Sequence, residues 1–288
     1  MLAFLSNSMP LRSVTLLLLG LGQSDAHSIY GSRNGGHLLR AAGFTCRRSV
    51  APAEGARVFL SAEDAALWSH HVLSNTSALS YLEWGSGGTT VVAAWRALQA
   101  QALGIPSLRV VSMESSPNWL RHLHSRYPVL RQAEANAPLQ LESASLEPTG
   151  MWGIPMGWTT RPLSLRRQQV LNYSAVPTPL AVPVPSGLAL AAAPATPFDV
   201  IFADGRFRIF CAVRALRLAH AGTIFLVHDN HRLYNNSLAP WFVTTRQADK
   251  LVQLQPRPTA LRAAHRNSTD YQDDLQRLLQ SAIHGAIG

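Results

Sequence analysis

The fold is decided by the stretch Tyr81-Leu82-Glu83-Trp84-Gly85-Ser86-Gly87-Gly88-Thr89-Thr90. An apolar run over residues 78–82 leads into an acid, then a glycine-rich turn, and then an apolar helical pattern. This order predicts a strand, a loop and a helix. Glycines in such a loop let the backbone approach a nucleotide-like ligand closely. We expect a cofactor to contact the loop residues Gly85, Ser86, Gly87 and Gly88, with Glu83 beneath them.

The rest of the chain alternates between apolar runs of strand length and helical patterns. Strands are predicted at residues 78–83, 108–113, 139–142, 198–203, 222–227, 251–254 and 261–265. Helices are predicted at residues 58–72, 90–103, 117–125, 206–219 and 240–248. This alternation predicts an α/β fold with a mostly parallel sheet and right-handed crossovers. In such sheets, ligands bind at the carboxyl ends of the strands, near the point where strand order reverses.

The chain of 288 residues divides into a leader, a linker and one domain. Residues 1–26 are interpreted as a signal peptide or targeting leader, and residues 27–57 as a linker rich in Gly, Ser and Arg. Residues 58–288 are interpreted as the domain. Within it, residues 174–197 carry six prolines and no charge. Because proline interrupts helices and strands, this segment is predicted to be an extended insertion.

The sequence of the leader, residues 1–26, predicts the cellular compartment of the protein. Arg12 precedes an apolar run over residues 13–21, and Ser24 and Ala26 supply the small residues of a cleavage site. This pattern resembles a secretory signal peptide, which places the protein in the Golgi lumen or outside the cell. An uncleaved N-terminal anchor and an arginine-rich organelle transit peptide are the alternatives. Sequons that suit secretion of a glycoprotein occur at Asn75, Asn172, Asn235 and Asn267.

The net charge of +9 comes almost entirely from arginine, and Lys250 is the single lysine. The basic residues are scattered, so the sequence does not signal nucleic-acid binding. An anionic small molecule or an acidic glycan is an equally good partner, and genomic base composition is an alternative source of the arginines. Cys46 and Cys211 are the two cysteines, which excludes a disulfide framework and a cysteine metal site. Cys211 falls on an apolar helical face and is predicted to be core.

A second acid follows the second predicted strand, at Glu114. A carboxylate there can accept both ribose hydroxyls of an adenosine, a chemistry that several nucleotide-binding folds share. The loop after the first predicted strand distinguishes among these nucleotide-binding folds. The acid Glu83 lies at the start of that loop and would repel the pyrophosphate of a dinucleotide. The alternative for Glu114 is a solvated residue at the start of a helix.

The run from residue 198 to residue 208, Phe-Asp-Val-Ile-Phe-Ala-Asp-Gly-Arg-Phe-Arg, is the most specific. Asp204 ends a buried strand and is predicted to point into the site. There it would contact the cofactor, orient an acceptor hydroxyl or bind a metal. Arg208 lies at the edge of an apolar helical face, where a guanidinium needs an anionic or carbonyl partner. A contact to a substrate anion and an internal salt bridge are the two interpretations of Arg208.

The fifth predicted strand ends at His228, Asp229 and Asn230, on the same sheet edge as Asp204. His228 is a candidate general base for an acceptor hydroxyl, because the pKa of a free imidazole lies near neutrality. Asp204, Asp229 and Asn230 together supply three hard oxygen ligands, which suit Mg²⁺ or Ca²⁺. A structural role for His228 and Asp229 at the strand end is the alternative.

Four motifs in this order resemble an uncharacterised group of class I S-adenosylmethionine (SAM)-dependent methyltransferase-like proteins. They are residues 81–90, the Trp-Gly-Ile-Pro of residues 152–155, residues 198–208 and the Val-His-Asp-Asn-His-Arg-Leu-Tyr of residues 227–234. The resemblance covers roughly residues 58–254. It implies a Rossmann-like seven-stranded methyltransferase sheet with helices on both faces, and SAM bound by the residue 83–89 loop and Glu114. Trp152 is expected to wall the adenine or acceptor pocket, or to pack in the core.

Two better-known groups add mechanisms. Catechol and caffeoyl-CoA O-methyltransferases hold a divalent metal with an aspartate after the fourth strand and an Asp-Asn pair after the fifth. Asp204, Asp229 and Asn230 are similar in type and order, but His228 lengthens the run by one residue and that family's catalytic lysine region has no match. Glucuronoxylan methyltransferases suggest, by analogy, an acidic sugar as acceptor.

The sequence therefore predicts a SAM-dependent methyltransferase that transfers a methyl group in line to an oxygen of a small molecule or acidic glycan. SAM would be held by Glu83, the loop glycines and Glu114. Asp204, His228 and Asp229 would serve the acceptor side. A non-catalytic binding or scaffold protein and a nicotinamide-dependent oxidoreductase are the alternatives. The oligomeric state is left open.

Overall fold

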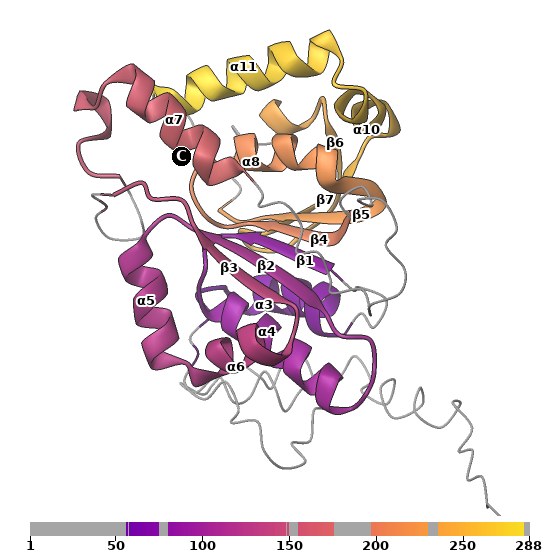
Figure 1. Ribbon diagram of the computed structural model, residues 1–288. Helices are drawn as coiled ribbons and strands as arrows, with labels where there is room; N and C mark the ends of the chain where they lie inside the picture. The colour runs from indigo at the N-terminus through magenta and orange to yellow at the C-terminus, as the bar shows by residue number, and fades with distance from the viewer. Residues whose placement is uncertain are drawn as a thin grey trace, which may run out of the picture.

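The computed structural model describes residues 56, 58–74, 80–147, 149, 155–175, 197–229 and 236–284 (Figure 1). The predicted leader and nearly all of the predicted linker lie outside these residues. Trp152, Asn230 and residues 176–196 of the predicted insertion also lie outside them. Within the described ranges, no helix is both long enough and apolar enough to cross a membrane.

Seven strands form one sheet in the order β3-β2-β1-β4-β5-β7-β6. In chain order the strands are β1 (Ser80–Trp84), β2 (Arg109–Glu114), β3 (Leu139–Ser143), β4 (Phe198–Ala203), β5 (Ala219–Val227), β6 (Phe242–Gln247) and β7 (Val252–Pro256). The first five are parallel, and β7 lies antiparallel to both β5 and β6. This is the Rossmann-like seven-stranded methyltransferase sheet that the sequence resemblance implies. Its strand order reverses between β1 and β4.

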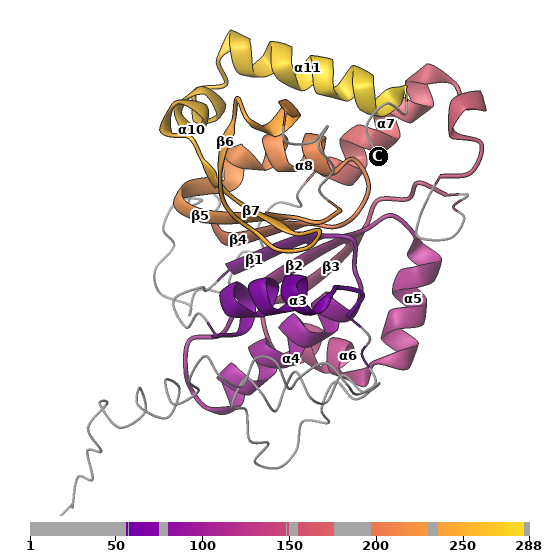
Figure 2. The same ribbon diagram turned by 180° about the vertical axis from the view of Figure 1, so that it is seen from behind.

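Helices cover both faces of the sheet (Figures 1 and 2). One face carries α3 (Ala62–Ser69), α4 (Gly88–Ala102), α5 (Pro117–Arg126) and α6 (Pro128–Asn136). The other face carries α7 (Leu163–Ser174), α8 (Arg208–Ala215), α10 (Pro258–His265) and α11 (Thr269–Ile283). Short turns of other helix types are a π-helix at His70–Ser74 and 3₁₀ turns at Trp158–Thr160 and Leu216–Leu218.

The central strands β1, β2 and β4 are buried on both faces, which explains their continuous apolar runs. All of β1 is buried. Because side chains alternate along a strand, Leu82 and Trp84 pack in the core under α7 and α8, whereas Tyr81 packs in the core over α3 and α4. Cys211 is fully buried in the first of these cores, as its helical position predicts.

Two predicted elements in the C-terminal part are wrong. The predicted helix at residues 240–248 is strand β6, in which the β-branched Val243, Thr244 and Thr245 favour extended backbone. The predicted strand at residues 261–265 is the end of α10, a helix that starts at Pro258, where the missing N–H costs no hydrogen bond. Helices α6, α7 and α11 were not predicted, and the other predicted elements occur with ends shifted by a few residues.

The carboxyl ends of β1 and β4 approach each other backbone to backbone. Gly85 has a φ of +98°, and a Cβ on it would lie 2.8 Å from the Gly205 nitrogen. A Cβ on Gly205 would lie 1.9 Å from the Tyr173 hydroxyl oxygen. Both positions therefore need glycine, one for its left-handed backbone as well as for space.

The close approach of Gly85 to Gly205 predicts that a side chain at Gly85 lowers the stability of the protein. Replacing Gly85→Ala should lower the free energy of unfolding by more than about 1 kcal/mol, because alanine is strained at positive φ and its Cβ meets backbone. The matched control is Gly87→Ala, two residues on, where φ is extended and a Cβ meets nothing within 4 Å. That change should stay within about 0.5 kcal/mol of wild type. Urea unfolding of the two variants tests this, and equal losses would contradict it.

Candidate functional site

A cavity of about 1070 Å³ opens at the carboxyl ends of β1, β2 and β4. Its wall includes the loop of residues 85–88 after β1, Glu114 at the end of β2 and Asp204 just after β4. Since strand order reverses between β1 and β4, this is the edge of the sheet at which such folds bind ligands. The volume suits a small molecule of cofactor size.

The glycine loop forms the floor of the cavity. Gly87 has a φ of −168°, which any residue adopts, and a Cβ there would meet no protein atom within 4 Å. Glycine at this position therefore leaves room for a ligand and relieves no strain. The Trp119 Nε1 donates a hydrogen bond to the Ser86 carbonyl oxygen at 2.8 Å, and its ring stacks on His122. Both rings line the cavity and give it a flat aromatic wall.

Glu83 lies beneath the loop and outside the cavity wall. Its side chain is fully buried, and its carboxyl oxygens accept hydrogen bonds from the Thr89 and Thr90 hydroxyls, the second at 2.7 Å. Burial raises the pKa of Glu83 to about 8, although the two threonine hydroxyls oppose that rise. Glu83 therefore ties the end of β1 to the first turn of α4. At neutral pH it is mostly protonated.

Glu114 lies in the cavity wall. Its Oε1 accepts hydrogen bonds from the Ser116 N–H at 2.8 Å and the Ser115 hydroxyl at 3.0 Å. Burial raises the pKa of Glu114, and these donors oppose the rise. A second carboxylate, that of Glu147, accepts 3.0 Å hydrogen bonds from the Ser116 hydroxyl and the Asn118 amide. The wall near β2 can thus accept hydrogen bonds from hydroxyl or amino groups of a ligand.

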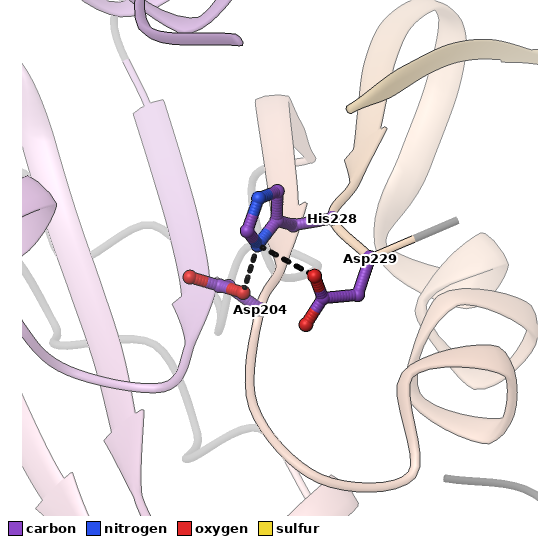
Figure 3. A group of neighbouring side chains, drawn as sticks. All are labelled: Asp204, His228 and Asp229. Atoms are coloured by element: carbon purple, nitrogen blue, oxygen red, sulfur yellow. Dashed lines mark hydrogen bonds and ion pairs between the residues drawn. The ribbon is translucent and has the colours of Figure 1, made fainter. Parts of the chain in front are cut away.

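Asp204 belongs both to the cavity wall and to a cluster of charged side chains behind it (Figure 3). His228 at the end of β5 places Nδ1 2.8 Å from Asp204 Oδ1. Arg208, in the first turn of α8, places one guanidinium nitrogen 3.4 Å from Asp204 Oδ1 and 3.1 Å from Asp229 Oδ2. Of the two interpretations of Arg208, the internal salt bridge is the one that the structure contains.

Burial lowers the pKa of His228, but the hydrogen bond and negative charge of Asp204, together with the charge of Asp229, outweigh burial and raise the pKa overall. Asp229 itself has a φ of +51°. Burial acts to raise its pKa, yet the Arg208 guanidinium and His228 lower it overall. The cluster is therefore held together by opposite charges within the protein.

The cluster does not fit a divalent metal. One atom each from Asp204, His228 and Asp229 lies within 4.8 Å of the others, which is a ligand set by distance alone. However, the Arg208 guanidinium already bridges the two carboxylates. A metal there would sit beside a fixed positive charge and would take the lone pair of a His228 nitrogen that instead faces Asp204 at hydrogen-bond distance. Asn230, the third predicted ligand, lies outside the described residues.

The predicted site residues fall into two groups. One cavity wall contains Gly85, Ser86, Gly87, Gly88, Glu114 and Asp204. Three other predicted residues lie behind that wall: Glu83 beneath the loop, and His228 and Asp229 behind Asp204. The two groups are joined through Asp204, which faces the cavity on one side and contacts His228 on the other.

Several wall residues were missed from the sequence. Trp119 and Glu147 carried a signal, since each follows the carboxyl end of a strand by a few residues. Tyr173 carried none. It ends α7, just before the insertion, and reaches the wall because its hydroxyl accepts a hydrogen bond from the Arg206 N–H at 3.3 Å. Long-range contacts of this kind leave no local pattern.

No protein-family model matches the chain, and neither does any curated protein. Among solved structures, the chain is similar to a methyltransferase-like protein from Silicibacter pomeroyi, at 21% identity over 73% of this chain and 96% of that chain, with a TM-score of 0.48. It is also similar to a precorrin-6y C5,15-methyltransferase from Geobacter metallireducens, at 12% identity over 66% of this chain and 84% of that chain, with a TM-score of 0.33.

The class of protein follows from the sheet. The order β3-β2-β1-β4-β5-β7-β6, with β7 antiparallel to its neighbours, defines an α/β protein with a Rossmann-like methyltransferase fold. The ligand cavity lies where that fold reverses its strand order.

Glu83 predicts an unusual pH dependence of stability. Its folded pKa of about 8 lies above its ordinary value of 4.5, so between these pH values the folded state binds more protons than the unfolded state. Raising the pH through this window should therefore lower the free energy of unfolding of wild type relative to Glu83→Gln. Urea unfolding of both proteins near pH 5 and near pH 8 measures the difference. The control Glu63→Gln removes an exposed glutamate and should run parallel to wild type. A constant difference between wild type and Glu83→Gln would contradict the prediction.

Proposed function

We propose that the protein is a SAM-dependent methyltransferase that acts on an oxygen of its acceptor. One observation carries the proposal: a single cavity joins the glycine loop of residues 85–88, Glu114 and Asp204 at the reversal of strand order. Each of the three suits a part of SAM.

The adenosine part suits the end of the cavity near β2. Glu114 can accept hydrogen bonds from the two ribose hydroxyls, and Trp119 and His122 offer aromatic faces on which a base can stack. Glu147, which lines the same region, can accept a hydrogen bond from the amino group of adenine.

The methionine part suits the glycine loop and Asp204. The first turn of α4 begins at Gly88 and presents free backbone N–H groups, which attract a carboxylate. The ligand also carries an ammonium and a sulfonium. These positive charges match a wall that contains the carboxyl groups of Glu114, Glu147 and Asp204.

The same wall argues against a nicotinamide dinucleotide. From the sequence, Glu83 is expected to repel a pyrophosphate. In the structure, however, Glu83 is buried beneath the loop and mostly protonated at neutral pH. Asp204 supplies the repulsion instead, because a pyrophosphate on the loop would lie in the same cavity as its side chain.

Methyl transfer to oxygen needs no covalent bond between the protein and the substrate. The acceptor must lie in line with the sulfonium methyl group, and its hydroxyl must lose a proton. Asp204 is the predicted acceptor-side residue that lines the cavity, and Arg208 and His228 hold it from behind. Because the cluster does not fit a divalent metal, no step is assigned to one.

The acceptor and the compartment belong to the same proposal. A net charge of +9 and the presence of Arg206 in the cavity wall favour an anionic acceptor, such as an acidic glycan or an anionic small molecule. The apolar leader and the sequons favour the secretory pathway, where such glycans are modified.

A calorimetric titration of the full-length protein with S-adenosylhomocysteine tests the cofactor. Micromolar binding is expected, with no gain from Mg²⁺ and no binding of NADH. Glu114→Ala should weaken binding about tenfold to a hundredfold, because it removes hydrogen bonds to a charged group. Gly87→Val should weaken it by about tenfold or more, because its side chain extends into the space that is open beside Gly87.

Three outcomes would contradict the proposal. Binding of NADH in place of S-adenosylhomocysteine would favour an oxidoreductase. No binding of either by the folded protein would favour a scaffold. A gain in affinity with Mg²⁺ would overturn the conclusion that the charged cluster excludes a metal. The matched control is Glu63→Gln, an exposed residue that does not line the cavity, which should bind as wild type does.

A further inference from the structure

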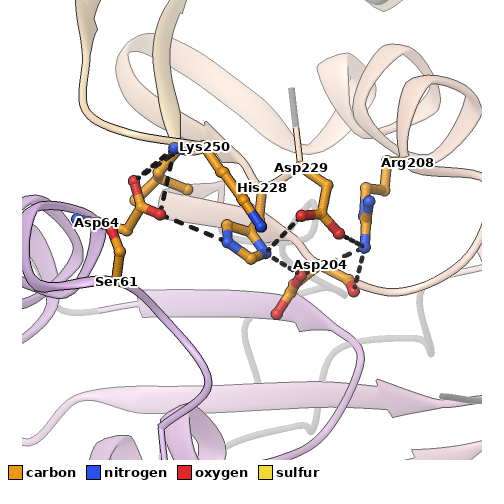
Figure 4. A network of polar contacts seen from close by, with 8 residues as sticks. Ser61, Asp64, Asp204, Arg208, His228, Asp229 and Lys250 are labelled. Carbon is orange, nitrogen blue, oxygen red and sulfur yellow. Dashed lines mark hydrogen bonds and ion pairs between the residues drawn. The ribbon is translucent and has the colours of Figure 1, made fainter. Parts of the chain in front are cut away.

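Asp64 is an acid that the proposed function does not use. It lies in the first turn of α3, and its side chain is fully buried. Its Oδ1 accepts hydrogen bonds from the backbone N–H groups of Lys250 at 3.0 Å and Leu251 at 2.8 Å, in the turn between β6 and β7 (Figure 4). The remaining oxygen, Oδ2, lies at a longer 3.3 Å from the same Lys250 N–H, and a fully buried carboxylate is costly unless it is fully paired.

The remaining oxygen faces His228. Asp64 Oδ2 lies 3.6 Å from His228 Nε2, while His228 Nδ1 lies 2.8 Å from Asp204 Oδ1. Both ring nitrogens of His228 therefore point at carboxylates, one buried and one in the cavity wall (Figure 4). A carboxylate accepts hydrogen bonds and donates none, so each ring nitrogen satisfies its partner best when it carries a proton.

We propose that Asp64 is a positioning residue that holds His228 as an imidazolium, so that Asp204 and not His228 accepts the proton of the methyl acceptor. The proposal rests on the proposed function. His228 is absent from the cavity wall and has no ring nitrogen facing it, whereas Asp204 lines the wall. The general base predicted from the sequence is thus replaced by a fixed cation behind an aspartate.

The proposed methyl transfer conserves atoms, electron pairs and charge. An oxygen lone pair of the acceptor hydroxyl forms the new bond to the methyl carbon as the carbon–sulfur bond breaks, and that bonding pair stays on sulfur. The hydroxyl proton passes to a carboxylate oxygen of Asp204 and later to solvent. The products are the methyl ether, the neutral thioether and one proton.

The charges around His228 favour the imidazolium. Asp64 on α3, Asp204 after β4 and Asp229 after β5 face it, the last at 3.9 Å. The guanidinium of Arg208 on α8 disfavours a positive charge on His228, but the pKa of His228 is raised overall. Lys250 acts on Asp229 from the turn before β7. Three acids against one guanidinium and one more distant ammonium leave room for one further positive charge, which His228 supplies.

The test reads the protonation of His228 directly. The full-length protein, labelled with ¹⁵N and kept free of divalent metals, gives imidazole nitrogen–proton correlations by NMR at neutral pH. His228 is assigned by the signals lost in His228→Gln. We expect protons on both ring nitrogens in wild type, and a neutral ring that keeps only the Nδ1 proton in Asp64→Asn.

A matched control lies at the opposite edge of the sheet. His220 Nε2 contacts Asp199 Oδ1 at 3.2 Å, at the amino ends of β4 and β5. Asp199→Asn should change the His220 signals and leave those of His228 as in wild type.

A neutral His228 in the wild-type protein would overturn the proposal, and this spectrum decides even if Asp64→Asn does not fold. An imidazolium that survives in folded Asp64→Asn would overturn the role of Asp64. The spectra are recorded without ligand. A failed titration with S-adenosylhomocysteine would therefore sink the proposed function and leave the result on His228 unaffected.

Discussion

The contact on which the rest of the structure depends is the backbone approach of Gly85 to Gly205, at the ends of β1 and β4. Because neither residue has a side chain, the two loops close against each other and against the Tyr173 hydroxyl. The cavity then forms beside the β1 loop, and Asp204 is held between that cavity and the charged cluster behind it. Any side chain at either glycine would separate the two halves of the site.

Burial and charge divide the acids of the site into two kinds. Glu83 and Asp64 are fully buried and face protein donors, so they fix the geometry of a loop and of an imidazole. Glu114 and Asp204 line the cavity and keep part of their surface for a ligand. An acid that looks like a ligand-binding residue in the sequence can therefore act one layer below the ligand, as Glu83 does.

Strands β1, β2 and β4 were readable from the sequence because they are buried along nearly their whole length and end at or next to an acid or a glycine. The antiparallel hairpin of β6 and β7 was harder, since β6 is an exposed edge strand without an apolar run. Residues in the wall of the cavity followed from strand ends. Asp64 did not, because its partner His228 is distant in the chain and only the folded sheet brings α3 beside the end of β5.

The overall charge of the protein and the charge of its cavity have opposite signs. The chain carries a net charge of +9, yet in the cavity wall the acids Glu114, Glu147 and Asp204 outnumber the arginines Arg126 and Arg206. Arg208 does not line the cavity, because it is 8% exposed and turned toward the cluster behind the wall. Under the proposed function, the acids of the wall complement a cationic cofactor, and Arg206 in the same wall complements an anionic acceptor.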